Sequence, residues 1–86
     1  MPKISAVIIT RNEERNIGRC LDSLKGMVDE ILIVDSFSTD RTREIAEKAG
    51  ARFLEKEWLG YSATKNWANA QTAHPYILSL DADEAL

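Results

Sequence analysis

Acidic side chains follow the last apolar segment of the sequence, and their spacing suits a divalent cation. The segment Tyr76–Leu80 is typical of a strand, and Asp81, Asp83 and Glu84 come after it. Carboxylates at positions i and i+2 can hold Mg²⁺ or Mn²⁺ while a substrate diphosphate supplies further oxygens. Open α/β sheets bind ligands at the carboxyl ends of their strands. The pattern therefore indicates a metal-bridged nucleotide, and the alternative is a solvated acidic loop.

Two further polar segments follow apolar runs of strand length. Thr10–Glu13 come directly after the β-branched run Ile4–Ile9, and Asp35–Asp40 come directly after Ile31–Val34. Nearly continuous apolar runs are typical of strands buried on both faces of a parallel sheet, and the first run is expected to be central in it. Loops that follow parallel strands meet at one rim. Both polar segments and Asp81–Glu84 are therefore expected to face one pocket.

The first polar segment offers three side chains that suit a nucleotide. The Thr10 hydroxyl can donate and accept hydrogen bonds, and the Arg11 guanidinium can meet a phosphate. The Glu13 carboxylate can accept a hydrogen bond from a base or a ribose. Acidic residues near a helix start are also stabilising without a ligand, so helix-start electrostatics stays open as the alternative for Arg11 and Glu13.

The second polar segment and a later helix add two candidates. Asp35 lies where a strand leaves the core and can accept an N–H from a nucleobase or a hydroxyl from a ribose, with a local Asx-turn as the alternative. Asp40 is interpreted as a helix cap rather than a ligand-binding residue. Lys65 can reach diphosphate oxygens as a mobile point charge, or can lie on a solvated helix surface. No catalytic residue is predicted, because His74 is better explained as a helix-end residue than as a general base.

The elements that must position these side chains follow from hydrophobic spacing. Strands alternate with helices in the order β-α-β-α-β-α-β, which predicts an α/β fold with a Rossmann-like parallel sheet and right-handed crossovers. Asn12 is predicted to cap the first helix, and Ala51–Glu55 to form a short strand at or near an edge. In the third helix, Ala63, Trp67 and Ala70 are predicted to lie on one face.

The composition is that of an ordinary soluble globular chain. Of 86 residues, 44% are apolar and 29% are charged, and the net charge is −3. Charges of both signs are mixed along the chain, which gives no basic surface for nucleic acid. Cys20 is the only cysteine, so an internal disulfide is excluded and a buried thiol is favoured over a nucleophile. The sequence shows neither a signal segment nor an apolar run of transmembrane length, so a cytoplasmic protein is expected.

Together these motifs resemble those of the family 2 glycosyltransferases, which have the GT-A fold. The similarity covers Ile4–Glu84 and keeps the family's order of motifs. Val7–Glu14 looks like the opening strand and nucleotide loop, and Glu30–Asp40 looks like the second block. Lys65-Asn66 precedes the last strand at the usual distance, and Asp81–Glu84 is similar to the family's Asp-x-Asp motif. The individual residues of these motifs most resemble those of bacterial lipopolysaccharide-core glucosyltransferase-like members.

The resemblance implies a transferase that moves a sugar from a UDP-sugar donor to a hydroxyl of a saccharide or lipid-linked acceptor. It implies inversion at the sugar, a Mg²⁺ or Mn²⁺ cofactor, and a role in cell-envelope polysaccharide or lipopolysaccharide synthesis. By position, the implied site residues are Thr10 and Glu13 in the nucleotide pocket, Asp35 at the base, Lys65 at the diphosphate, Asp81 at the ribose or base, and Asp83 as the metal ligand.

Two features limit what carries over from the family. Many members have Val-Asp-Asp-Gly-Ser where this chain has Val34-Asp35-Ser36-Phe37-Ser38, so Asp35 is kept but the carboxylate at Ser36 is missing. The family's catalytic base and acceptor site lie beyond the acidic motif and have no counterpart here. Residues 1–86 are therefore predicted to be a single nucleotide-sugar-binding domain and a fragment of a longer enzyme. This fragment is predicted to be inactive in isolation. Contact with the inner face of the membrane is expected only through regions outside these residues.

Two other classes of protein fit parts of this sequence. One is a nucleotide- or cation-binding module without transferase activity. The other is a sugar nucleotidyltransferase, which is disfavoured because that class expects a Gly-rich loop after the first strand and Thr10–Glu13 contains no glycine.

Overall fold

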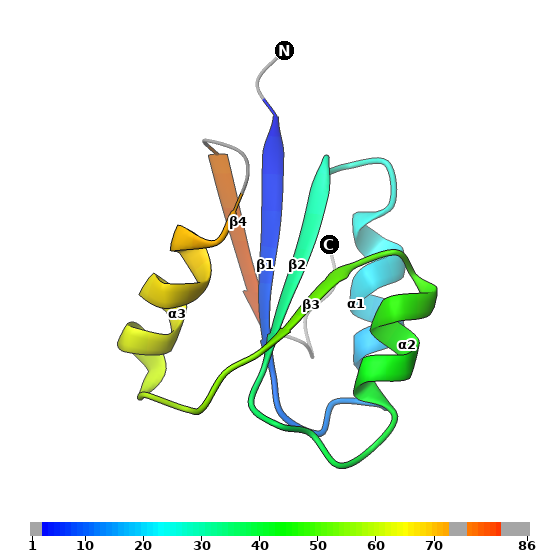
Figure 1. Cartoon of the computed structure of the whole chain (residues 1–86). Helices are drawn as coiled ribbons and strands as arrows, with labels where there is room; N and C mark the ends of the chain where they lie inside the picture. The colour runs from blue at the N-terminus through cyan, green and yellow to red at the C-terminus, as the bar shows by residue number, and fades with distance from the viewer. Residues whose placement is uncertain (1–2, 73–75, 82–86) are drawn as a thin grey trace.

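The computed structural model describes residues 3–72 and 76–81, and within these ranges strands and helices alternate as predicted (Figure 1). No helix in this part of the chain is long and apolar enough to cross a membrane. The elements are β1 (Ile4–Thr10), α1 (Ile17–Leu24), β2 (Glu30–Asp35), α2 (Thr42–Lys48), β3 (Arg52–Glu55), α3 (Tyr61–Ala70) and β4 (Tyr76–Asp81).

The four strands form one sheet in the order β3-β2-β1-β4, and every neighbouring pair is parallel. The predicted α/β fold with a Rossmann-like parallel sheet is confirmed. β1 lies between β2 and β4, and β3 lies at an edge, as predicted for both. The register pairs Thr10 with Asp35 and Ile9 with Asp81, so three strands end at the same rim.

Helices cover both faces of the sheet: α1 and α2 lie on one side and α3 on the other (Figure 1). Successive side chains of a strand point to opposite faces, so β1 contributes to two clusters. Ala6 and Ile8 pack in the cluster that includes α1 and α2, whereas Val7 packs with Ala68 of α3. This two-sided burial explains why the strand sequences are apolar at almost every position.

The face that α3 turns toward the sheet differs from the prediction. Thr64 and Ala68 are buried, Trp67 is half-buried, and Ala63 and Ala70 are exposed. Thr64 is drawn inward because its hydroxyl accepts a hydrogen bond from the backbone of the loop before the helix, at 2.9 Å. The predicted inward face was therefore wrong for the two alanines.

Candidate functional site

The loops after β1 and β2 are joined by hydrogen bonds at the carboxyl end of the sheet (Figure 1). The Asn12 amide donates to Ser38 Oγ at 2.7 Å, and the Thr39 amide donates to Asn12 Oδ1 at 2.8 Å. Asn12 therefore does not cap the first helix, which begins at Ile17; the predicted cap was wrong. Its φ of 52° is one that asparagine tolerates, and this conformation turns its side chain toward the second loop. The two polar segments lie side by side, as expected.

Asp35 is the centre of this network. It is 1% exposed. One carboxylate oxygen accepts the hydroxyls of Thr10 and Ser38, each at 2.5 Å, and the other accepts the Ser38 amide at 2.6 Å. The last of these bonds is that of an Asx-type turn. The arrangement makes Asp35 a residue that holds both loops in position, and it brings together two of the predicted site residues.

Asp40 and Thr42 join the start of α2 to the segment before α1 that contains Glu13 and Glu14. The Glu13 amide donates to Thr42 Oγ1 at 2.9 Å, and the Glu14 amide donates to Asp40 Oδ2 at 3.1 Å. Asp40 Oδ1 also accepts the amide and the hydroxyl of Thr42, at 3.0 and 2.5 Å. Burial acts to raise the pKa of Asp40, but the bonds from Thr42 and Glu14 outweigh it and lower the pKa. The N-cap of α2 is Arg41, which makes no side-chain cap hydrogen bond, and Asp40, one residue earlier, accepts the amide of the first helical residue in its place.

Substitution of Asp40 by alanine is expected to lower the free energy of unfolding by about 1 kcal/mol, because the amides of Glu14 and Thr42 lose their acceptor. The folded-state pKa of Asp40 lies below its ordinary value of 3.8, so its contribution is complete above about pH 5 and is lost as the pH falls through the lower folded-state value. Urea titrations of the wild type and Asp40→Ala from pH 7 down to pH 2.5 should therefore converge at low pH. Asp40→Asn serves as the matched control, since it keeps an acceptor oxygen without the charge. A stability difference that is constant with pH would contradict this assignment.

A cavity of about 340 Å³ opens at the same rim. Arg11 lines it, and Thr10 joins it from the end of β1. The cavity is also lined by Ser36 and Trp58, which were not predicted as site residues. The available sequence signal for Trp58 was a tryptophan in a polar loop before a helix. In the structure this side chain is 52% exposed.

The remaining predicted residues lie further along the chain. Lys65 lies in α3, on the opposite side of the sheet from α1 and α2, and its side chain is half-buried. The backbone of Asp81 ends β4 beside Ile9, one residue before Thr10. Asp83 lies outside the described residues. The last strand thus ends at the rim that carries Thr10, Arg11 and the cavity.

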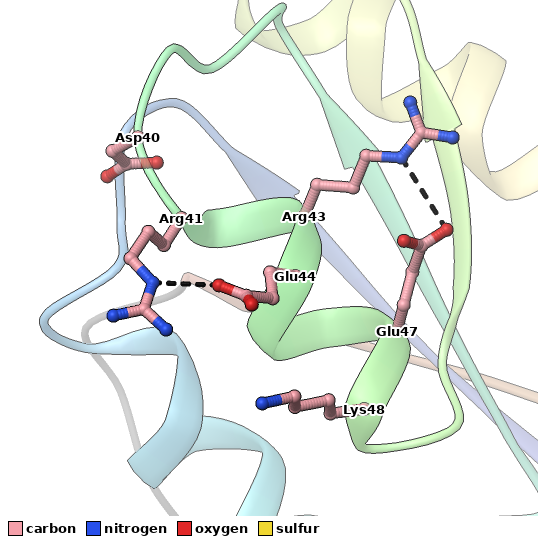
Figure 2. A pocket seen from close by; sticks show the side chains of 6 residues that line it. All are labelled: Asp40, Arg41, Arg43, Glu44, Glu47 and Lys48. Carbon is pink, nitrogen blue, oxygen red and sulfur yellow. Dashed lines mark hydrogen bonds and ion pairs between the residues drawn. The ribbon is translucent and has the colours of Figure 1, made fainter.

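A second hollow, of about 580 Å³, lies over α2 (Figure 2). The acidic and basic side chains there pair with one another: Arg41 Nε lies 2.7 Å from Glu44 Oε2, and Arg43 Nε lies 3.5 Å from Glu47 Oε2. The hydrogen bond between Arg41 and Glu44 raises the pKa of the arginine and lowers that of the glutamate. This arrangement is that of a solvated helix surface with ion pairs three and four residues apart, so the hollow is not taken as the site.

Comparison with known proteins agrees with the fold. The family model described as glycosyl transferase family 2 matches residues 5–86. The chain belongs to this family. A relative described as an uncharacterized glycosyltransferase, from Rickettsia felis, is 50% identical over 86 residues, which cover 100% of this chain and 30% of that protein. The lipopolysaccharide core biosynthesis glycosyltransferase LpsC of Rhizobium meliloti is 42% identical, and the match covers 100% of this chain and 34% of LpsC.

Solved structures of glycosyltransferases have the same arrangement of elements. Mannosyl-3-phosphoglycerate synthase from Rubrobacter xylanophilus matches with a TM-score of 0.84 and 26% identity, over 95% of this chain and 31% of that one. Glucosyl-3-phosphoglycerate synthase from Mycobacterium tuberculosis, solved with Mn²⁺, UDP and glucosyl-3-phosphoglycerate, matches with a TM-score of 0.79 and 27% identity, over 98% of this chain and 36% of that one. The chain therefore spans about a third of the length of these relatives and solved structures.

Proposed function

We propose that residues 1–86 form a single nucleotide-sugar-binding domain of a hexosyltransferase that uses a UDP-sugar donor. The acceptor is a hydroxyl of a saccharide or lipid-linked molecule, the reaction inverts the sugar, and the product belongs to cell-envelope polysaccharide or lipopolysaccharide. The similarity to LpsC supports the pathway, and the synthase solved with UDP supports the donor nucleotide. The observation that carries the proposal is the meeting of β1, β2 and β4 at a rim with a cavity between polar loops.

In this proposal the diphosphate is held jointly by the chain and by Mg²⁺ or Mn²⁺, with Asp83 as the protein ligand. Among residues 3–72 and 76–81, no group of three or more His, Cys, Asp and Glu side chains could hold a metal by itself. A strand-end Asp-x-Asp fits this cation nevertheless, because Mg²⁺ is commonly bound by one or two carboxylates, substrate phosphates and water. When bound, the cation offsets the negative charge of the departing UDP. Mn²⁺ accompanies UDP in the mycobacterial synthase.

The other side chains are proposed to bind and orient the nucleotide. Thr10, Glu13, Asp35 and Asp81 line or shape the pocket for the base and ribose. The cations Arg11 and Lys65 approach the diphosphate, where a guanidinium or an ammonium is attracted to phosphate oxygens. The base that deprotonates the acceptor hydroxyl is proposed to lie outside this chain. The enzyme is proposed to work in the cytoplasm, and any contact with the inner face of the membrane is proposed to be made by regions outside this chain.

Binding of UDP is expected to depend on the divalent cation. In the complete protein, calorimetry should show a dissociation constant about 10- to 100-fold lower with MnCl₂ or MgCl₂ than with EDTA, because the cation joins Asp83 to the diphosphate. Asp83→Ala should remove this difference. Asp22→Ala is the matched control, because Asp22 is an exposed carboxylate of α1 that pairs only weakly with Lys25, at 3.8 Å. Equal affinity with and without metal in the wild type would contradict the proposed role of Asp83.

A further inference from the structure

Asn12 holds the loop after β1 to the loop after β2 through two exposed hydrogen bonds. Its amide donates to Ser38 Oγ at 2.7 Å, and its Oδ1 accepts the Thr39 amide at 2.8 Å. Among the described residues, Asn12 Oδ1 is the acceptor that the structure gives to the Thr39 amide. We call Asn12 with Ser38 and Thr39 the outer clasp. The attachment of the second loop at Thr39 therefore depends on one side chain.

The outer clasp needs the acceptor oxygen of Asn12 and its left-handed backbone. The φ of 52° lies in a region that asparagine and aspartate tolerate and that glycine adopts without strain. Asn12 Oδ1 accepts the amide of Thr39 and, at 3.4 Å, its hydroxyl, whereas the side-chain NH₂ group has no partner within the described ranges. An aspartate can therefore make the same contact at position 12, and a glycine can keep the turn while losing the contact.

The outer clasp joins two loops that line the rim cavity from different strands. Arg11, which precedes Asn12, lines the cavity from the first loop, and Ser36 lines it from the second. Ser38 Oγ also donates to Asp35, so the exposed clasp is connected to the buried carboxylate. The two anchors differ in burial, because Asp35 is 1% exposed whereas Asn12 lies at the surface. Opening of the outer clasp would therefore separate the two loops while the sheet stays folded.

We propose that Asn12 is a positioning residue whose outer clasp sets the fraction of molecules with a closed rim, without itself touching the ligand. This inference rests on the proposed function, in which a nucleoside diphosphate binds at this rim. Exposed hydrogen bonds open locally at a lower free energy than global unfolding. When only the closed form binds, the apparent dissociation constant is the intrinsic one divided by the closed fraction. By linkage, bound UDP must stabilise the clasp by the factor by which the clasp strengthens UDP binding.

The first test compares UDP affinity with melting temperature in the complete protein, with MnCl₂ present. Asn12→Gly is expected to weaken UDP binding about 3- to 10-fold, the effect of one lost hydrogen bond on the closed fraction. Its melting temperature without UDP should change little, because the lost bond is exposed and glycine accepts the left-handed backbone. Asn12→Asp should bind within about twofold of the wild type, because it restores the acceptor oxygen. Both variants and the wild type are compared in about 0.5 M NaCl, which screens the added charge.

The second test follows amide hydrogen exchange by NMR, which reports the clasp itself. In the wild type, UDP should slow exchange of the Thr39 amide. In Asn12→Gly this amide should exchange faster and should no longer respond to UDP. The Ser38 amide should stay protected in both proteins, because Asp35 accepts it at 2.6 Å. A side chain that only stabilised the fold would not give this local response to UDP.

Asn66→Ala is the matched control, because it removes an exposed asparagine side chain of α3, and it should change neither UDP affinity nor exchange at Thr39. Unchanged UDP affinity in Asn12→Gly would overturn the inference while the proposed function stands. So would an equal loss of affinity in Asn12→Gly and Asn12→Asp, or a loss that follows a fall in melting temperature. Absence of UDP binding by the wild type would overturn both the inference and the proposed function.

Discussion

Residues 1–86 alone are expected to release no UDP from UDP-glucose in the presence of a saccharide or lipid-linked acceptor, whereas a longer protein that contains them is expected to turn over. A carboxylate that ligates a cation must stay ionised beside it, while a general base must take a proton within about 3 Å of the acceptor hydroxyl. One strand-end motif cannot supply both environments. General-base catalysis contributes about 10²- to 10⁴-fold in rate, so its loss alone would abolish measurable turnover.

The measurement is acceptor-dependent UDP release by both proteins, assayed in parallel with Mn²⁺ and with EDTA. Circular dichroism of residues 1–86 is the control that the short chain is folded. The longer protein is included because the relatives are much longer than this chain, which covers 30% of the Rickettsia felis protein and 36% of the mycobacterial synthase. Metal- and acceptor-dependent turnover by the short chain would show that its own residues include the base.

The second large effect is expected at Asp35, where alanine should lower the free energy of unfolding by about 2 to 5 kcal/mol. The sequence motif alone suggests a contact with the base, and loss of that contact would leave the sheet intact. The structure adds another consequence, because the carboxylate is buried and accepts bonds from Thr10 and from the amide and hydroxyl of Ser38. Alanine would leave these donors buried and unpaired, so the two loops would lose the group that joins them.

Chemical denaturation of the wild type, Asp35→Ala and Asp35→Asn distinguishes the two roles. Asparagine keeps one acceptor for the Ser38 amide, and the hydroxyls of Thr10 and Ser38 can turn to accept from its NH₂ group. It should therefore cost much less stability than alanine. The exposed control Asp22→Ala should change stability by less than about 0.5 kcal/mol. If Asp35→Ala were as stable as the wild type but bound UDP more weakly, the carboxylate would face the ligand rather than the loops.

Local sequence patterns were sufficient to predict the order of elements and the rim. The runs Ile4–Ile9 and Ile31–Val34 are apolar at nearly every position, which is typical only of strands covered on both faces. Alternation with helices then requires parallel strands, and parallel strands bring their following loops to one end. The motifs at these loops also identified the family, because their order in the chain is itself a signal.

Local patterns were insufficient where a side chain can hydrogen-bond either to a neighbour in sequence or to a distant residue. Asn12 has the residue type of a helix cap, but its acceptor is used by Thr39, 27 residues away. The inward face of α3 was mispredicted because alanines carry little hydrophobic signal, whereas Thr64 is held inward by a hydrogen bond from the preceding loop. Each outcome depends on which loop lies opposite, and the sequence near the residue does not contain that information.

The amino-acid sequence by itself determined the fold class, the family and the rim at which polar residues gather, because these follow from periodicity and motif order within short segments. Only the tertiary structure decided what the polar residues do there. It showed the Asp35 carboxylate hydrogen-bonded to Thr10 and Ser38, and Ser36 buried at a cavity that Trp58 also lines, with no hydrogen-bond partner for its hydroxyl among the residues that the structure describes. The physical reason is that a hydrogen-bonding group is satisfied by whatever lies within about 3 Å, and that set of neighbours exists only after the loops of separate strands have come together.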